Sequence, residues 1–255
     1  DAGLQAILPT LTALINVGAR VLLVTHLGRP KGAAPALSTQ IIANYLKEKV
    51  PVKTTVQFLP DWPKSPCPYQ PGVIYVGENV RFFDGETVGD EALSRMMVQG
   101  ATTMMMEAFA VSHRMHASTQ GAMRLLSDVA LGPLFKRELR EVTQVLKHGK
   151  HPIVAVVGGS KVETKASFLQ SLLLNVDVLI VGGGLAHAFW RCKGYHIGAS
   201  LCDDASIPLA QDIMNQAKDL GKTLVLPVDA VVAPNLDGPT SIVDATLQNE
   251  IMEKI

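Results

Sequence analysis

Short runs of apolar residues alternate along the chain with segments in which apolar residues recur every three or four positions. Runs of four or five apolar residues are too short for helices and predict strands at 21–25, 73–76, 102–106, 153–157, 178–181 and 223–226, of which the first is expected to be buried. The periodic segments predict helices near residues 4–17, 38–49, 88–99, 162–174, 184–193 and 204–219. Strands that alternate with helices predict parallel sheets with right-handed crossovers, so the expected fold class is α/β.

One further helical pattern separates the first three predicted strands from the last three. Gly132 and Pro133 begin it, and Gly149 ends it. We expect this helix to join two lobes, each built on its own parallel sheet. The predicted organisation is a first lobe over residues 1–131, an interdomain helix over 132–149 and a second lobe over 150–255.

Composition narrows the possible partners. The 255 residues are 47% hydrophobic, which is enough for a sizeable core in one or two domains. The 23 Lys and Arg residues balance the 23 Asp and Glu residues, so no overall field attracts nucleic acid or an anionic membrane, and any anion site must be local. Cys67, Cys192 and Cys202 lack zinc-site spacing and are odd in number, which fits unpaired thiols in the reducing cytoplasm.

Residues 171–190 are apolar and about as long as a bilayer crossing. Asp177 would lie inside such a span at a cost of roughly 2.5–3.5 kcal/mol, and the glycines at 182–184 would interrupt it. We therefore expect a helix, a strand and a glycine turn here, and no membrane span.

Basic residues follow each strand predicted in the first lobe: His26, Arg29 and Lys31, then Arg81, then His113, Arg114 and His116. The carboxyl ends of parallel strands meet at one edge of a sheet, where ligands of open α/β sheets bind. Three converging clusters suit an anion with several oxygens, and phosphate is the leading candidate. The alternative for each residue alone is a solvated loop position or an ion pair with Glu78, Asp84 or Glu107. No third ligand accompanies His113 and His116, so we expect no metal site.

Glycine turns follow two strands predicted in the second lobe. They are Gly158-Gly159-Ser160-Lys161, with Lys165 four residues further on, and Gly182-Gly183-Gly184. Glycines let the backbone approach a phosphate, and the start of a helix favours an anion. We expect Lys161 and Lys165 to share a face of the following helix, and the turns to outline a mononucleotide site. Neither turn completes a Walker A loop or a dinucleotide fingerprint, and the alternative for each is a tight strand-to-helix turn.

The predicted strand ends carry few groups for acid–base chemistry. No Ser/His/Asp or Cys/His arrangement is suggested there. Phosphoryl transfer to or from an acyl phosphate needs no general base, because the attacking group is already an ionised carboxylate. Such catalysis consists of positioning and of cationic stabilisation of the transferring group, which the basic clusters fit.

The chain resembles phosphoglycerate kinase in a series of stretches that follow that family's order. These are Leu8–Thr10, His26–Gly32, Glu78–Phe82, Ala108–Phe109 with His113–Arg114 and Ala117–Thr119, Gly158–Val162 with Lys165, Gly182–Gly184 and Leu226–Asp229. The resemblance implies a monomeric, two-lobed, hinge-bending enzyme of glycolysis and gluconeogenesis with Rossmann-like lobes. It would convert 1,3-bisphosphoglycerate and ADP to 3-phosphoglycerate and ATP, with Mg²⁺ accompanying the nucleotide.

The resemblance also implies roles for single residues. His26, Leu27, Gly28, Arg29, Arg81 and Arg114 would hold the phosphoglycerate. Gly158, Gly159, Lys161 and Lys165 would meet the nucleotide phosphates, and Gly182, Gly183 and Gly184 would border the adenine. Arg29, Arg114, Lys161 and Lys165 would act as catalytic cations. The Mg²⁺ ligand would come from the family's C-terminal part, beyond Ile255.

Several departures from the family pattern bear on activity. The family's first strand would precede Asp1, so we expect a piece of a longer protein with both lobes incomplete. Gly3 stands where the family has an Arg. Without that Arg, the site would lose transition-state stabilisation on the order of several kcal/mol. Glu107 and Ala110 replace the family's Asp and Gly. The alternatives are therefore a binding-only homologue or an inactive fragment; a dinucleotide-binding oxidoreductase is disfavoured by the broken glycine fingerprint.

Overall fold

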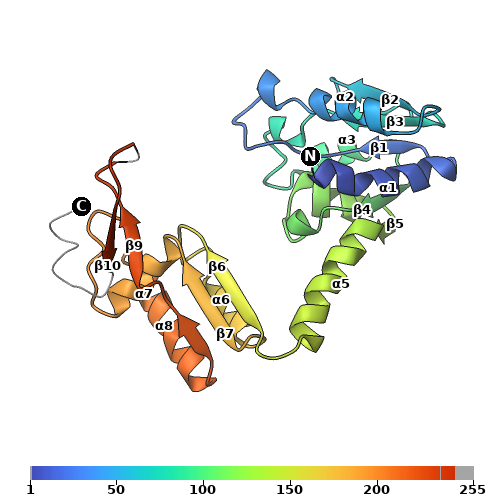
Figure 1. Cartoon of the computed structure of the whole chain (residues 1–255). Coiled ribbons are helices and arrows are strands. Elements are labelled where there is room, and N and C mark those ends of the chain that lie inside the picture. The colour runs from blue at the N-terminus through green and yellow to red at the C-terminus, as the bar shows by residue number, and fades with distance from the viewer. Residues whose placement is uncertain (1, 236, 245–255) are drawn as a thin grey trace. The chain divides into compact units, whose positions relative to one another are not determined.

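The computed structural model describes residues 2–235 and 237–244. The chain forms two compact units, and the boundary between Glu141 and Val142 falls inside helix α5 (Pro133–His148) (Figure 1). This helix coincides with the connecting helix that the sequence predicts. The predicted lobe limits at residues 131 and 150 stay a prediction.

The first unit combines two parallel sheets with helices. Its helices are α1 (Ala2–Asn16), α2 (Gln40–Lys49), α3 (Glu91–Met97), α4 (Ala122–Leu125) and the start of α5. Its strands are β1 (Val21–Leu23), β2 (Thr55–Leu59), β3 (Val73–Gly77), β4 (Thr103–Met106) and β5 (Asp128–Leu131). The first three strands form a sheet in the order β1-β3-β2, and β4 pairs with β5.

Two of these strands, β2 and β5, were not predicted. In β2 exposed and buried positions alternate, with Thr55 and Gln57 exposed and Val56 buried, as expected for a strand at the edge of its sheet. In β5 only Ala130 is better covered than its neighbours. A search for continuous apolar runs therefore finds β1, β3 and β4 and passes over β2 and β5, although β1 and β4 also lie at sheet edges.

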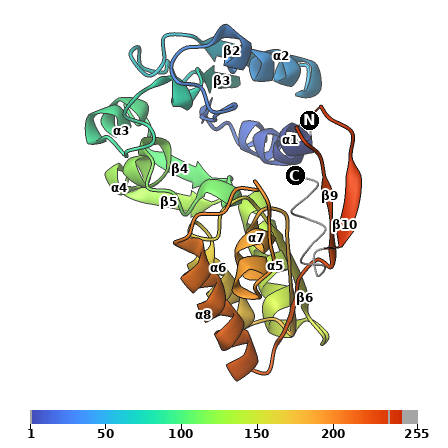
Figure 2. The same cartoon turned by 90° about the vertical axis from the view of Figure 1, so that its left-hand side faces the viewer.

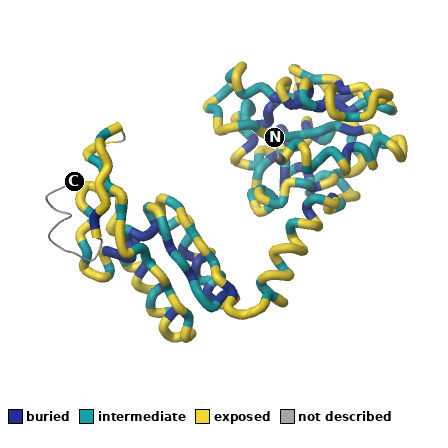
Figure 3. The backbone as a smooth tube through the Cα atoms, viewed as in Figure 1, coloured by how far each residue is buried: buried dark blue, intermediate teal, exposed yellow. Residues whose placement is uncertain are grey.

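The apolar stripe of α1 and one face of α2 cover the β1-β3-β2 sheet. Leu11, Leu46 and Ile74 are buried at the centre of this core. A second cluster surrounds Trp62, which is 1% exposed. A side chain at Gly77 would overlap the Trp62 ring, so the end of β3 requires glycine there. Figure 3 colours the buried residues of the chain dark blue.

The second unit has a three-stranded parallel sheet in the order β6-β7-β8. The strands of the second unit are β6 (Val154–Gly158), β7 (Val178–Gly182), β8 (Thr223–Val225), β9 (Asp229–Val232) and β10 (Ser241–Asp244). Its complete helices are α6 (Ala166–Leu173), α7 (Leu185–Cys192) and α8 (Ser206–Asp219). Parallel sheets flanked by helices confirm the α/β prediction. The antiparallel pair β9 and β10 was not predicted (Figure 2).

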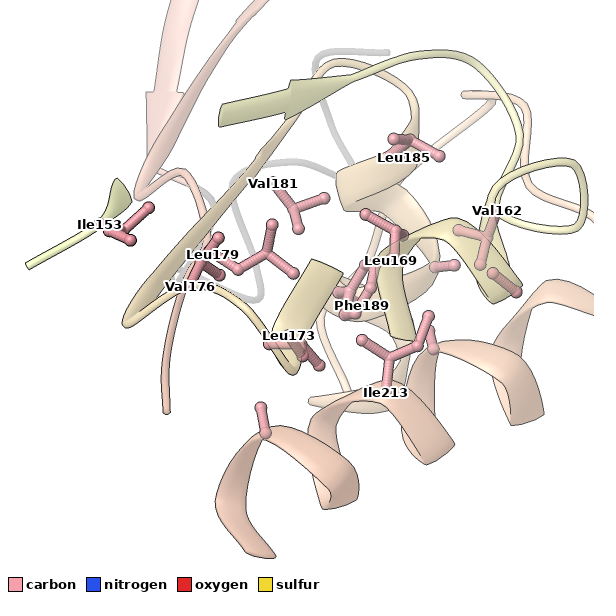
Figure 4. Packing of buried hydrophobic residues seen from close by; sticks show 14 residues of the cluster. Ile153, Val162, Leu169, Leu173, Val176, Leu179, Val181, Leu185, Phe189 and Ile213 are labelled. Atoms are coloured by element: carbon pink, nitrogen blue, oxygen red, sulfur yellow. The ribbon is translucent and has the colours of Figure 1, made fainter. Parts of the chain in front are cut away.

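Side chains from three helices and from β7 meet in the core of the second unit. Leu169 and Leu173 of α6 point toward Leu179 of β7, Phe189 of α7 and Ile213 of α8, and all five are fully buried (Figure 4). The segment 171–190 thus folds as the end of α6, strand β7 and helix α7, as expected. No helix of the described residues is long and apolar enough to cross a membrane.

Asp177 joins the beginnings of the three parallel strands in this unit. Its carboxylate accepts hydrogen bonds from the Ile153 backbone N–H (2.7 Å), from His151 Nδ1 (2.6 Å) and from Lys222 Nζ (3.5 Å). Its backbone oxygen accepts from the Thr223 N–H at 3.0 Å. The Ile153 N–H, followed by the His151 hydrogen bond, lowers the pKa of Asp177 to about 2.

This pKa predicts how the stability of the second unit depends on pH. Folding favours the ionised form of Asp177, so the stabilisation is fully present above about pH 4 and is lost as the pH falls toward about 2. We expect Asp177→Asn to be less stable than the parent at neutral pH and to approach it near pH 2. Hydrogen exchange of the β6, β7 and β8 amides measures the difference.

Asp212→Asn, on the exposed face of α8, is the matched control, since Asp212 has no hydrogen-bond partner among the described residues. A stability difference between Asp177→Asn and the parent that stayed constant from neutral pH to about pH 2 would contradict the prediction.

Candidate functional site

The side chain of Asn79 holds together the loops that carry the cations of the first unit. Its Nδ2 donates to the backbone oxygens of Leu27 and Leu37, both at 2.8 Å, and its Oδ1 accepts from the Arg81 N–H at 3.0 Å. Asn79 is fully buried. One amide therefore fixes the loop after β1 relative to the start of the turn that carries Arg81.

Glu78 fixes the same region to α2, and no Lys, Arg or His of residues 2–235 and 237–244 forms an ion pair with it. Its carboxylate accepts hydrogen bonds from Ser38 Oγ (2.8 Å), from the Thr39 N–H (2.9 Å) and from the Asn79 N–H (2.6 Å). Within the described residues, no carboxylate forms an ion pair with Arg29, Arg81 or Arg114.

Cations from three separate loops lie close enough to affect one another. Although His26 is exposed on one side, desolvation of its ring lowers its pKa, and the positive charges of Arg81 and Arg114 lower it further. The pKa of His116 is lowered by burial and by the same two arginines, while Glu86 opposes the shift. The structure thus brings together His26, Arg81 and Arg114, which follow three different strands.

Glu86 is a buried carboxylate under this group, and the sequence analysis missed it. It is 1% exposed and accepts hydrogen bonds from the Ser118 N–H (2.9 Å) and Ser118 Oγ (2.6 Å). Its Oε1 lies 3.5 Å from His116 Nδ1. Thr119 Oγ1 donates to the Arg114 backbone oxygen at 2.7 Å, so the segment after Arg114 is held at several points. Nothing in its spacing marks Glu86 as buried.

Arg29 and Arg81 line one open depression, together with Pro30, Lys31, Gly32, Phe83, Asp84 and Thr87. Nε of Arg81 is buried and has no hydrogen-bond partner within the described residues, which is costly for a charged donor unless a ligand meets it. Gly28 has a φ of +65°, and a side chain there would also crowd Leu37 at 3.1 Å. Only glycine suits this turn without strain. His113 is exposed.

The two glycine turns of the second unit pack backbone against backbone. Gly158 and Gly182 lie opposite each other in β6 and β7. Gly183 has a φ of +63°, and a Cβ on Gly184 would lie 3.1 Å from Ser160 Cα. The Leu185 N–H donates to the Gly159 oxygen at 2.8 Å. The fold therefore favours glycine at positions 183 and 184 whether or not a ligand binds there.

The prediction that Lys161 and Lys165 share a helix face is wrong. Helix α6 begins only at Ala166, and the Lys165 N–H donates to the Val162 oxygen at 2.8 Å to close a turn before it. Val162 is 1% exposed and anchors this turn in the core, so the chain enters the helix later than its apolar pattern indicates. Both lysines nevertheless flank the glycine turn after β6.

The two lysines differ in their partners. Lys161 Nζ lies 3.1 Å from Asp203 Oδ2, and this hydrogen bond and the charge of Asp203 raise the pKa of Lys161. The aliphatic part of Lys165 crosses Gly159, with Cε 2.7 Å from where a Cβ of that glycine would lie. No carboxylate pairs with Lys165 in the part of the chain that the structure describes.

Comparison with known proteins decides the family. The family model described as "Phosphoglycerate kinase" matches residues 1–254. The chain belongs to the phosphoglycerate kinase family. A curated phosphoglycerate kinase from Legionella pneumophila (strain Paris) is 39% identical over 251 residues, or 98% of this chain and 63% of that protein. Phosphoglycerate kinase 3, cytosolic, from Arabidopsis thaliana is 35% identical, with 96% of this chain and 63% of that protein covered.

Solved structures of phosphoglycerate kinases are also similar to this chain. Phosphoglycerate kinase from Coxiella burnetii is 36% identical, with a TM-score of 0.70 over 95% of this chain and 62% of that one. The enzyme from Pyrococcus horikoshii OT3 is 23% identical with a TM-score of 0.75, over 96% of this chain and 63% of that one, and shows likeness of fold alone. The chain spans about 63% of the length of the curated relatives above.

Two departures from the phosphoglycerate kinase pattern have different surroundings. Glu107 accepts hydrogen bonds from Thr10 Oγ1 (2.5 Å) and from the Phe135 N–H at the start of α5 (3.0 Å). A side chain at Gly132 would overlap this carboxyl group, so glycine makes room for it. Gly3 is exposed in the first turn of α1, and a Cβ there would meet no atom within 4 Å.

The buried amide of Asn79 generates a prediction. Asp has the same shape, but an ionised carboxylate cannot donate to the Leu27 and Leu37 oxygens. We expect Asn79→Asp to lose about 2–6 kcal/mol of stability, because two buried acceptors lose their donor. Denaturant unfolding measures the loss. Asn175→Asp is the control, since Asn175 donates one exposed bond to the Ser171 oxygen; equal losses in the two variants would contradict the prediction.

Proposed function

We propose that the protein catalyses the reversible transfer of a phosphoryl group from 1,3-bisphosphoglycerate to ADP, giving 3-phosphoglycerate and ATP. Membership of the phosphoglycerate kinase family supports this reaction. The observation that carries it is the grouping of His26, Arg81 and Arg114 from three loops, in which neither arginine is paired with a carboxylate of the described residues. Such a group suits a substrate with a carboxylate and a phosphate.

The first unit is the proposed phosphoglycerate side. Arg29 and Arg81 line the same depression, so both residues border a space that an anionic ligand can enter. Arg114 adds a positive charge beside His26, whose own pKa is lowered. Leu27 and Gly28 would present their backbone to the substrate, and the substrate would be a small molecule held by charge-assisted hydrogen bonds.

The second unit is the proposed nucleotide side. Lys165 is a cation without a carboxylate partner in the described residues, beside Gly158 and Gly159, so it fits a nucleotide phosphate. Lys161 lies in the same turn and would contribute once it leaves Asp203. Gly182, Gly183 and Gly184 would border the adenine. Bound ADP or ATP would supply the phosphoryl acceptor or donor.

Mg²⁺ is expected to accompany the nucleotide. The described residues contain no group of three or more His, Cys, Asp or Glu side chains that could hold a metal ion by themselves. Mg²⁺ that is bound together with a nucleotide needs only one or two carboxylates beside the phosphates, and the resemblance implies that this protein ligand comes from the family's C-terminal part, beyond Ile255.

The proposed chemistry needs no general base. In the direction of ATP consumption, an oxygen of the ionised 3-phosphoglycerate carboxylate forms a bond to the γ-phosphorus of ATP, and the bond from that phosphorus to the β–γ bridging oxygen breaks. Arg29, Arg114, Lys161 and Lys165 would stabilise the negative charge of the transferring group. We further propose a monomer in the cytosol, where relatives from Arabidopsis thaliana and Triticum aestivum are named as cytosolic.

Single variants of the full-length protein separate the two sides. We expect Arg29→Ala and Arg114→Ala to weaken 3-phosphoglycerate binding by about 10–100-fold, because each loses charge-assisted hydrogen bonds, and to leave ATP binding unchanged. Lys165→Ala should lower turnover by about 10²–10³-fold with little change in 3-phosphoglycerate affinity. Calorimetric titration measures the affinities for 3-phosphoglycerate and ATP, and a coupled assay measures turnover. Equal losses for both ligands in the arginine variants would defeat the assignment of units.

A binding-only homologue is the second candidate, and the absent side chain at Gly3 favours it. The surroundings of Gly3 are open, so an Arg fits there without displacing a neighbour. If the missing guanidinium limits turnover, Gly3→Arg should raise turnover on the order of 10²-fold, while Gly3→Ala, which adds helix propensity without charge, should not. Initial rates of the full-length parent, Gly3→Arg and Gly3→Ala proteins measure this difference in turnover. Fast turnover of the parent, unchanged in both variants, would remove this candidate.

A further inference from the structure

The two lysines beside the glycine turn after β6 differ in whether a carboxylate pairs with them. Lys161 is held by Asp203 at 3.1 Å, whereas Lys165 has no carboxylate partner in the described part of the chain. An anion that approaches this turn therefore meets one available cation and one that is already neutralised. The carboxylate on Lys161 comes from a segment 42 residues further along the chain.

Asp203 is positioned by the beginning of α8. The Ser206 N–H donates to the Asp203 backbone oxygen at 2.9 Å, which forms the turn that leads into the helix. The residue before α8 makes no side-chain cap, and Lys161 Nζ is the hydrogen-bond partner of the Asp203 carboxylate within residues 2–235 and 237–244. The carboxylate is thus directed at the lysine and not at the helix start.

The next residue provides a natural comparison. Asp204 has the same charge and lies one position away, but its carboxylate pairs with Arg191 Nη1 at 3.0 Å, at the end of α7. Arg191 lies outside the glycine turns. Neutralising Asp203 or Asp204 therefore changes the net charge of this region equally, while only the first change releases Lys161.

We propose that Asp203 competes with nucleotide phosphates for Lys161 and so lowers the affinity of the second unit for ATP and ADP. This inference rests on the proposed function, because it takes the nucleotide phosphates as the anion. A phosphate carries more negative charge than a carboxylate and can displace it from the ammonium group. Lys161 would then exchange one anionic partner for another, and Asp203 would face solvent.

The solvent exposure of the Lys161–Asp203 ion pair limits how much Asp203 can change nucleotide affinity. The Lys161 and Asp203 side chains are 60% and 61% exposed. Exposed ion pairs change an equilibrium constant by no more than about fivefold, and salt weakens them. Asp203 can thus reduce nucleotide affinity severalfold without preventing binding, and the reduction shrinks as ionic strength rises.

The test is calorimetric titration of the full-length protein with ATP, at about 10 mM and about 100 mM added salt. We expect Asp203→Asn to bind ATP about two- to fivefold more tightly at the lower salt and to lose most of this gain at the higher salt. Asp204→Asn should stay within about 1.5-fold of the parent. In a Lys161→Met background, Asp203→Asn should give no gain, because the competed group is gone.

The outcomes separate this inference from the proposed function. Equal gains in Asp203→Asn and Asp204→Asn would show a general charge effect and overturn the competition, as would an unchanged or weaker affinity in Asp203→Asn. A gain that persists with Lys161→Met would also overturn it. Failure of the parent to bind ATP at either salt concentration would overturn the proposed function, and the inference with it.

Discussion

Like charges repel one another, and the first unit has to hold several basic side chains side by side. Two features of the structure make this possible. The pKa values of His26 and His116 are lowered, so both imidazoles tend to shed their protons, and the buried carboxylate of Glu86 offsets part of the remaining charge. The amide of Asn79 is neutral, so it can order the surrounding loops without neutralising an arginine. Carboxylates such as Glu78 are directed at backbone and hydroxyl donors, which keeps the guanidinium groups available.

The second unit meets a different constraint, which is steric. The two turns after β6 and β7 approach each other so closely that Gly184 has backbone atoms of Ser160 at 3.1 Å from its Cβ position. Close packing leaves little room for a side chain at Gly184, and the side chain of Lys165 occupies the space beside Gly159. Charge in this unit is therefore brought in from the sides, by Lys161 and Lys165, and is balanced locally by Asp203. In the first unit neutral hydrogen bonds order the cations, and in the second unit one cation is held by an ion pair.

The sequence predicts those parts of this arrangement that depend on local pattern. The strand at 73–77 is continuous and apolar because both its faces are covered, whereas exposed positions interrupt β2 and β5 and leave a weaker signal. The start of α6 was misplaced because burial of Val162, a tertiary contact, holds the preceding turn. The basic residues could be found from their positions after strands. Glu86 could not, because a glutamate in a polar stretch gives no sign that Ser118 will meet it 32 residues later.

Departures from a family pattern have consequences that depend on their neighbours. Glu107 has a longer side chain than the aspartate that the resemblance implies, yet Gly132 leaves space for it, and its carboxylate binds both Thr10 and the start of α5. That substitution is absorbed by its surroundings. At Gly3 no atom approaches within 4 Å of the Cβ position, so no neighbour fills the space next to this glycine. A shape change can be compensated by an adjacent glycine, but a missing positive charge can be replaced only by another cation within reach. The consequence of Gly3 therefore depends on which cations reach the transferring group, and not on the stability of α1.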